Sequence, residues 1–277
     1  MRRVVASLAA LALAGCTPTP APSPSASPPA QSTGPSASPA TASLAVYYTL
    51  SDRGTPKLVR EFHRLAGAVD TPAGKTTAAV AEMLRPTAFD PDYKTLWPAG
   101  VRVLGSSVSG DEVTVDLTGV SGSGGLGAEA EGQAVQQLVW TATATSGASR
   151  VRVHVDGAAV ETLFGHVSVK DPVRRAAALD TLHRVWVIAP QHGETVGQDV
   201  TVHLAGIVFE NTLNYEILQN GKVVRHEVVT MDPGSPAMGE KTLTVRLSPG
   251  TYVVQAYEIS MADSSRQHVD NHTFTVA

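Results

Sequence analysis

Residues 215–224 have the sequence Tyr-Glu-Ile-Leu-Gln-Asn-Gly-Lys-Val-Val. An Asn-Gly pair between two apolar runs is a strong signal of a two-residue β-hairpin, because both residues readily adopt positive φ angles. The pair Asn220-Gly221 therefore predicts two antiparallel strands joined by a tight turn. Hairpins repeated at short spacing are typical of all-β sandwiches.

The chain around this hairpin, residues 183–277, contains seven apolar runs separated by turn residues. The predicted strands are residues 184–188, 200–205, 214–218, 223–229, 242–247, 251–259 and 268–276. Seven short strands at this spacing predict an immunoglobulin-like sandwich. Tyr252 follows the turn Leu247-Ser248-Pro249-Gly250-Thr251, which resembles the turn before the tyrosine that anchors a corner in such domains.

Upstream, residues 44–170 mix helical and strand patterns. Thr71-Pro72 predicts the start of a helix that ends at Pro86, because proline is tolerated in the first helical turn but not in the interior. Apolar residues spaced three and four apart predict a second helix over residues 128–145. Alternating apolar residues predict hairpins, which pair 101–108 with 112–117 and 151–155 with 159–164. This mixture predicts an α+β domain with its helices on one face of a sheet.

Two shorter segments complete the folded part. Residues 44–49 are predicted to form a strand closed by a turn at 51–54, whereas residues 57–66 fit both a helix and a second hairpin strand. Residues 171–182 are predicted to link the α+β domain to the sandwich, with a short helix as one option.

The first 16 residues have the pattern of an export signal. Arg2 and Arg3 precede an uncharged apolar run of about eleven residues, which is shorter than the roughly 20 residues a membrane span needs. The run leads to Leu13-Ala14-Gly15-Cys16, which resembles the lipobox of bacterial lipoproteins. That resemblance implies cleavage before Cys16 and a thioether between its sulfur and a diacylglycerol, whose two palmitate-type acyl chains insert into the membrane. The alternatives are an ordinary cleaved signal peptide and an uncleaved anchor.

Residues 17–43 contain only Ala, Pro, Ser, Thr, Gly and one Gln, and they carry no charge. Such a segment has almost nothing to bury and is predicted to be a disordered or polyproline-like tether, with a reach of roughly 80 Å. Cys16 is the only cysteine of the 277 residues, so no intramolecular disulfide can form. The Ala-, Gly-, Val- and Arg-rich composition suggests an actinobacterial source.

Several segments together resemble the GerMN domain, a family known from sporulation and germination proteins. They include Trp97-Pro98-Ala99-Gly100-Val101, the strand 113–117 and Asp156-Gly157 followed by Glu161-Thr162-Leu163-Phe164-Gly165-His166. The second region, with Val187-Ile188-Ala189-Pro190, resembles the immunoglobulin-like domain described from spore germination proteins. These resemblances imply an extracytoplasmic assembly module, and they imply no catalytic residues.

The sequence predicts no catalytic residues, no cofactor-binding site and no metal site. The segment 122–127 matches G-x-G-x-x-G, but the surrounding unit has one crossover and its flanking strands are predicted to be antiparallel. The nearest acid at a strand end, Asp156, is also too far along the chain for a dinucleotide site. His268 and His272 are predicted to lie about 13 Å apart on one strand face, too far to share a metal. Asp90-Pro91-Asp92 and Asp111-Glu112 are predicted to be solvated turns, and His166 to bond the backbone at a strand end.

The net charge of −4 and the scattered basic residues argue against a nucleic-acid partner. The leading hypothesis is a non-enzymatic lipoprotein anchored on the extracytoplasmic face of the membrane, which binds protein or cell-wall partners through sheet edges of the sandwich. Two alternatives remain open. One is a wall-polymer hydrolase with paired carboxylates, and the other is a small-molecule-binding lipoprotein that serves a transporter.

Overall fold

The computed structural model describes residues 40–67, 69–120 and 125–277. The predicted signal peptide with Cys16 and nearly all of the predicted tether lie outside these residues. The unit Pro39–Ala277 is compact. Among the described residues, no helix is both long enough and apolar enough to cross a membrane.

A long hairpin opens the first domain. Strands β1 (Thr41–Asp52) and β2 (Thr55–Ala66) pair along their whole length, with a turn at Arg53 and Gly54, which both have positive φ. The segment that fitted either a helix or a strand is therefore a strand. β1 begins at Thr41, so residues 41–43, predicted as the end of the tether, belong to the hairpin.

Both predicted helices are confirmed. α1 (Pro72–Met83) begins after Thr71, whose side chain accepts a hydrogen bond from the Gly74 amide. α2 (Ala128–Ser146) ends at Gly147, which adopts the left-handed conformation with φ of 76°. A residue with a Cβ is disfavoured there, so the glycine sets the end of the helix.

The second sheet of this domain corrects two predictions. Its core strands are β3 (Arg102–Ser109), β4 (Glu112–Thr118) and β5 (Arg150–Val155). β4 and β5 are parallel and joined through α2, whereas the strands flanking the glycine segment were predicted to be antiparallel. The predicted strand 159–164 shrinks to β6 (Ala158–Ala159), and β7 (Val173–Arg174), from the predicted linker, pairs with the other end of β5.

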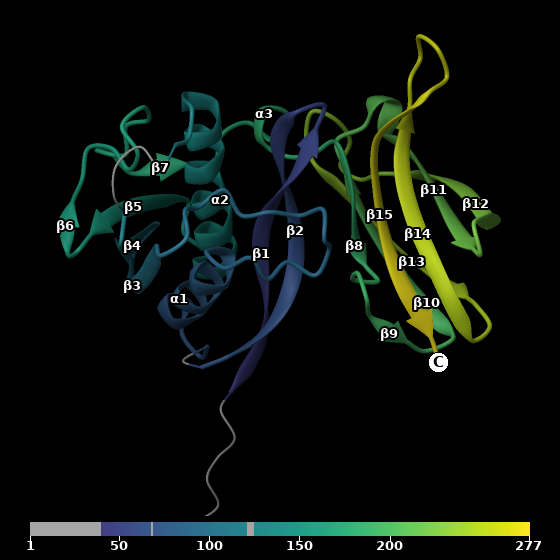
Figure 1. The fold of residues 1–277 in the computed structure, drawn as a ribbon, viewed down its shortest axis with the longest axis horizontal. Coiled ribbons are helices and arrows are strands. Elements are labelled where there is room, and N and C mark those ends of the chain that lie inside the picture. Colours follow the sequence, from purple (N-terminus) through teal and green to yellow (C-terminus); the bar gives the residue numbers. More distant parts are fainter. Residues whose placement is uncertain (1–39, 68, 121–124) are drawn as a thin grey trace, which may run out of the picture. The chain divides into compact units, whose positions relative to one another are not determined.

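The helices do not simply cover one face of a single sheet. α1 and α2 pack against each other and lie between the β1–β2 hairpin and the β3–β4–β5 sheet (Figure 1). The hairpin thus forms a separate two-stranded layer. After the first domain, α3 (Ala178–Thr181) forms a single turn within the predicted linker.

The second domain is the predicted sandwich. One sheet contains β8 (Val185–Ala189), β10 (Asp199–Gly206) and β13 (Gly239–Arg246). The other has the order β12-β11-β14-β15-β9, with bounds β9 (Thr195–Val196), β11 (Thr212–Gln219), β12 (Lys222–Thr230), β14 (Gly250–Ile259) and β15 (Arg266–Val276); a short 3-10 turn, η1 (Phe209–Asn211), precedes β11.

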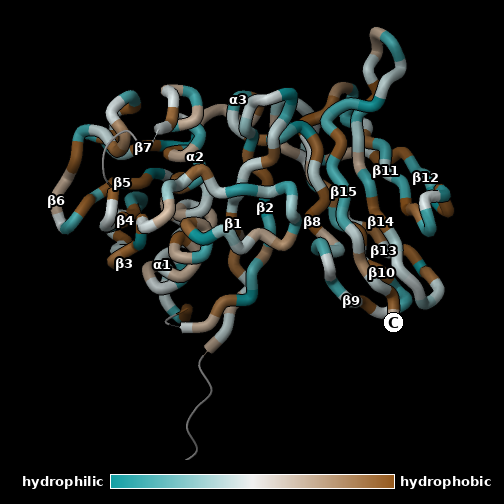
Figure 2. The backbone as a smooth tube through the Cα atoms, viewed as in Figure 1, coloured by the Kyte–Doolittle hydropathy of each residue, from teal (hydrophilic) through white to brown (hydrophobic). Residues whose placement is uncertain are grey.

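Two local predictions in the sandwich are also confirmed. Asn220 and Gly221 have φ of 51° and 75°, as the tight β11–β12 turn requires. The Tyr252 hydroxyl donates to the Ser248 carbonyl at 2.9 Å and closes the corner. Figure 2 shows hydrophobic and hydrophilic residues interspersed along the strands of this domain.

β8 contributes side chains to two different cores. Val185 and Val187 belong to the sandwich core, whereas Trp186 and Ile188, on the opposite face of the strand, join the core of the first domain. A strand covered on both faces is expected to be apolar throughout, as residues 185–188 are. The two domains therefore share a packed interface along β8.

Candidate functional site

Polar side chains gather where the two domains meet, on the β1–β2 hairpin, the loop after α1, the segment after β8 and β15. We call this contact region the interface. The sequence brings these side chains from positions up to 216 residues apart, since His268 contacts Asp52. Buried polar groups normally need partners, so their pairing defines the chemistry available here.

The first group, which we call the buried cluster, comprises Asp90, Tyr93, His192, Asp270 and His272. The Tyr93 hydroxyl donates to Asp270 Oδ2 at 2.8 Å and lies 3.3 Å from His272 Nε2. His272 Nε2 in turn lies 3.7 Å from Asp90 Oδ2, and His192 Nδ1 lies 3.0 Å from the same oxygen. One ligand atom each from Asp90, Asp270 and His272 falls within 4.8 Å of the others.

Burial dominates the electrostatics of this cluster. Asp90 is 2% exposed, Asp270 4% and His272 0%. Burial raises the pKa of the Asp270 carboxyl and raises the pKa of the Tyr93 phenol well above its usual range. Desolvation disfavours the charged form of each group, so two carboxylates here require a compensating positive charge or a shared proton.

Asp90 is held in place by a second arrangement, which we call the Glu–His–Glu cluster. Glu61 accepts hydrogen bonds from the amides of Phe89 (3.0 Å) and Asp90 (2.9 Å). His63 bridges Glu61 and Glu82, with contacts of 2.8 and 3.1 Å to its two ring nitrogens. Burial opposes a charge on His63, but the two carboxylates outweigh it and raise the His63 pKa to about 8.

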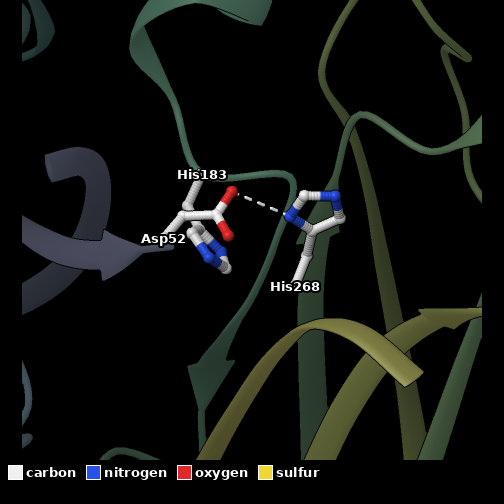
Figure 3. A group of neighbouring side chains, drawn as sticks. All are labelled: Asp52, His183 and His268. Atoms are coloured by element: carbon white, nitrogen blue, oxygen red, sulfur yellow. Dashed lines mark hydrogen bonds and ion pairs between the residues drawn. The ribbon is translucent and has the colours of Figure 1, made fainter. Parts of the chain in front are cut away.

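A further group contains Asp52, His183, Glu258 and His268, and we call it the second cluster. In Figure 3 the His268 ring points at the Asp52 carboxylate, and the His183 ring lies beside it. His268 Nδ1 is 2.9 Å from Asp52 Oδ2, and its Nε2 is 4.0 Å from Glu258. His183 Nδ1 bonds the Val185 carbonyl, and burial lowers the His183 pKa. His268 also has a positive φ of 52°, which is uncommon for a residue with a Cβ.

Direct backbone contacts complete the interface. The Gln191 side chain accepts from the Phe62 amide at 3.0 Å and donates to the Phe62 carbonyl at 2.9 Å, as a neighbouring strand would. The His183 amide donates to the Leu58 carbonyl at 2.8 Å. Arg60 and His203 both pair with Glu240. The hydrogen bond from His203 has the largest effect, and together with Arg60 it lowers the Glu240 pKa to about 2.

Several sequence-based expectations change in this light. Asp90 was predicted to lie in a solvated turn, but it is buried against two histidines because Glu61 pins its loop onto the hairpin. The His166 ring, which was predicted to bond the backbone, instead contacts the Glu131 carboxylate, with 2.8 Å between Nδ1 and the oxygen. Asp111 and Glu112 form ion pairs with Arg150, so they are not simply solvated. His268 and His272 lie in different clusters.

Other expectations fall on residues with little structural description. Cys16 lies outside the described residues, and so do residues 121–124 of the glycine segment. The parallel β4–β5 pair removes one argument made against a dinucleotide site, while the single crossover and the distance to Asp156 still argue against it.

Sequence reasoning missed the clustering of histidines with carboxylates, although one signal was present. On β15, Asp270 and His272 share a strand face with Phe274 and Val276, which are buried in the sandwich core. Polar residues at positions where the alternation demands apolar ones are often buried with partners. Their partners, on a loop 180 residues earlier, gave no local signal.

Two segments of the chain match the models of known domain families. Residues 45–161 match the Germane family model, described as sporulation and spore germination. Residues 184–265 match the Gmad2 family model, described as an immunoglobulin-like domain of bacterial spore germination. No curated protein matches the chain.

Similar solved structures include the tandem GerMN domains of the sporulation protein GerM from Bacillus subtilis, at 19% identity over 55% of this chain, with a TM-score of 0.41. The chain spans about half, 51%, of that structure. The first GerMN domain of the same protein matches at 18% identity over 48% of this chain and 98% of its own, with a TM-score of 0.35. CopC from Methylosinus trichosporium OB3b matches at 24% identity over 34% of this chain and 93% of its own, with a TM-score of 0.25.

Proposed function

Because the chain carries a Germane domain followed by a Gmad2 domain, we propose that it is a non-enzymatic lipoprotein that binds partners in the cell envelope. The domain pair links it to the sporulation and germination families. The export signal, the single cysteine in a lipobox-like context and the uncharged tether support a position on the extracytoplasmic face of the membrane.

The anchor can be tested by changing one atom. Cys16→Ser should abolish incorporation of radiolabelled palmitate and release the protein from membranes, because serine cannot form the thioether to diacylglycerol. Ser25→Ala, in the same uncharged segment, is the matched control and should stay labelled. A Cys16→Ser protein that remains labelled and membrane-bound would refute the lipid anchor.

The proposed binding surface is the free edge of β12, the outermost strand of the five-stranded sheet. Val223, Val224 and Val228 on this strand are 49%, 52% and 58% exposed. An edge strand offers unpaired backbone groups, and extended peptides add to such edges while apolar side chains contribute specificity. An extended segment of an envelope protein would fit this edge, and this exposed strand is the observation that carries the proposal.

A photo-reactive amino acid at position 224, introduced in intact cells, should capture a partner protein. The matched control is position 104, because Leu104 is an equally apolar residue, 57% exposed, on the first domain. A second control keeps only the anchor and tether. Capture at 224 that does not exceed both controls would contradict the assignment of this edge.

The hydrolase alternative draws no support from the pair of carboxylates in the buried cluster. Asp90 and Asp270 are almost completely buried, and a glycan chain must reach both carboxyl groups to be cleaved. The transporter alternative predicts a largely apolar ligand site between the domains, whereas the described interface is rich in histidines and carboxylates.

A further inference from the structure

We propose that the buried cluster binds a divalent transition-metal ion of the zinc type, with Asp90, Asp270 and His272 as ligands. The three residues come from both domains, since Asp90 follows α1 and the other two lie on β15. An ion here would fasten the first domain to the sandwich. This goes beyond the proposed partner binding, which concerns β12. In the five-stranded sheet, β12 is one edge strand, and β15 lies near the other edge.

The separations suit a shared ion. Two ligands about 2.1 Å from a zinc ion, at angles between tetrahedral and trigonal, lie roughly 3.4–3.6 Å apart. His272 Nε2 and Asp90 Oδ2 are 3.7 Å apart, which is too long for a hydrogen bond but close to that ligand spacing. All three ligand atoms lie within 4.8 Å of one another.

The surrounding hydrogen bonds orient the ligands. His272 Nδ1 lies 2.8 Å from the Pro190 carbonyl, which can only accept, so Nδ1 carries a proton and Nε2 is the nitrogen on the side of the carboxylates. Metal-binding histidines typically have their other nitrogen fixed in this way. Asp270 Oδ2 accepts from Tyr93 and from the Val187 amide, and Asp90 Oδ1 accepts from the Asp92 amide.

The charge balance also favours a cation. Asp90 and Asp270 bring two carboxylates into a buried site, and among the described residues the ion pairs of Asp90 involve only His192 and His272. A divalent ion supplies the opposite charge without burying a long basic side chain. Mixed nitrogen and oxygen ligands suit zinc and its neighbours in the first transition series.

His192 is the nearest candidate for a fourth ligand. It is 26% exposed at the side chain, its Nδ1 already contacts Asp90, and its ring centre is 6.1 Å from that of His272. Two imidazoles on one tetrahedral ion have ring centres about 5 Å apart, so a movement of roughly 1 Å would suffice. Surface depressions of about 300 and 230 Å³ reach Asp90 and His192 from two sides and offer an entry path.

The second cluster is a less suitable site. Its His268 and Asp52 already bond each other directly at 2.9 Å, and their side chains are 14% and 18% exposed. A metal would have to break that bond before using both groups. This makes His268 a good internal control for His272, which lies on the same strand.

The test uses the full chain, purified without a histidine tag, stripped with EDTA and titrated with Co²⁺ and Zn²⁺. The wild type should bind one equivalent, give the visible absorption bands of tetrahedral Co²⁺, and show a rise in Tm of about 5 °C or more at 100-fold excess over Kd. His272→Gln and Asp90→Asn should each lower the affinity at least tenfold, because ligands to a buried ion are not replaceable by water alone.

Two controls separate ligand loss from unfolding or from other histidines. His226→Gln, at an exposed position on β12, and His268→Gln should both retain the equivalent of Co²⁺. Circular dichroism in EDTA identifies a variant that fails to fold, and Asp90→Asn then stands in for His272→Gln. The proposal is overturned if the wild type binds no metal, or if the variants of the buried cluster bind it as tightly as the wild type does. Neither outcome would affect the partner capture expected at β12.

Discussion

The hydrophobic cores of the two domains and the interface between the domains consist of different types of residue. The hydrophobic core of the sandwich is built from apolar residues and tyrosines, such as Leu204, Tyr215 and Phe274, each at most 1% exposed. At the interface, equally buried positions hold Glu61, His63 and His272. Apolar packing tolerates many arrangements, whereas buried hydrogen-bonded charges are stable in only one. The difference indicates that the interface fixes a specific relation between the domains.

The largest effect should come from removing the apolar side chain that crosses from the second domain into the first. Trp186 is fully buried, and Trp186→Ala should lower the free energy of unfolding by about 3–5 kcal/mol, through lost burial and a cavity. Urea unfolding measures it. Trp186→Phe should lose much less, because the indole nitrogen has no partner among the described residues. An alanine variant as stable as Leu104→Ala would show that the shared core contributes nothing.

Removing the central carboxylate of the interface should cost nearly as much. Glu61→Ala leaves His63 and the amides of Phe89 and Asp90 without their acceptor, and we expect a loss of about 3 kcal/mol. Glu161→Ala, at an exposed ion pair with Lys170, serves as the control and should change stability by less than about 0.5 kcal/mol. Equal effects in the two variants would break the contrast between interface and surface.

The interface should also respond to pH where the cores do not. The folded-state pKa of His63 is raised from 6.5 to about 8, so its stabilisation is fully present below pH 6.5 and is lost as pH rises through 8. The loss is about 2 kcal/mol for a shift of this size. Urea unfolding at pH 6 to 9 measures it, with His63→Gln as the reference. A wild type and variant that change in parallel would remove His63 as the cause.

The smallest effect should come from the strand-like contact of Gln191. Gln191→Ala removes two hydrogen bonds to Phe62 and should cost about 1–2 kcal/mol. Gln191→Glu should be no better than alanine, because one carboxylate oxygen would face the Phe62 carbonyl. Thermal unfolding compares the two. If glutamate restores wild-type stability, the amide is not pairing with the strand in the way described.

Much of the fold follows from local patterns in the sequence. The turn at Asn220-Gly221, the cap at Thr71-Pro72 and the stripe on α2 each depend on neighbours within a few residues, and the structure confirms them. The length of β6 and the direction in which β4 pairs with β5 depend on distant strands. The predictions of a longer strand and of antiparallel flanking strands were wrong.

The candidate metal site shows the same limit more sharply. Asp90, in a polar Pro-flanked segment, has the composition of a surface turn, and its burial depends on Glu61 and on a second domain. The apolar runs 44–48 and 185–188 did carry a usable signal, because a strand without alternation is covered on both faces. That signal shows that a partner layer exists but does not identify its residues.

The β1–β2 hairpin has a consequence for how the molecule can be divided. Its strand β1 is buried continuously from Val46 to Thr49, with helices on one side, and β2 bonds the linker and the segment after β8. The hairpin is therefore a layer that packs against both domains. Cutting the chain between residues 171 and 182 would leave the whole hairpin in the first fragment and would expose Trp186 and Ile188 of β8 in the second. The two fragments should therefore aggregate or reassociate rather than behave as independent modules. The domain boundary in the sequence is not a place where the molecule comes apart.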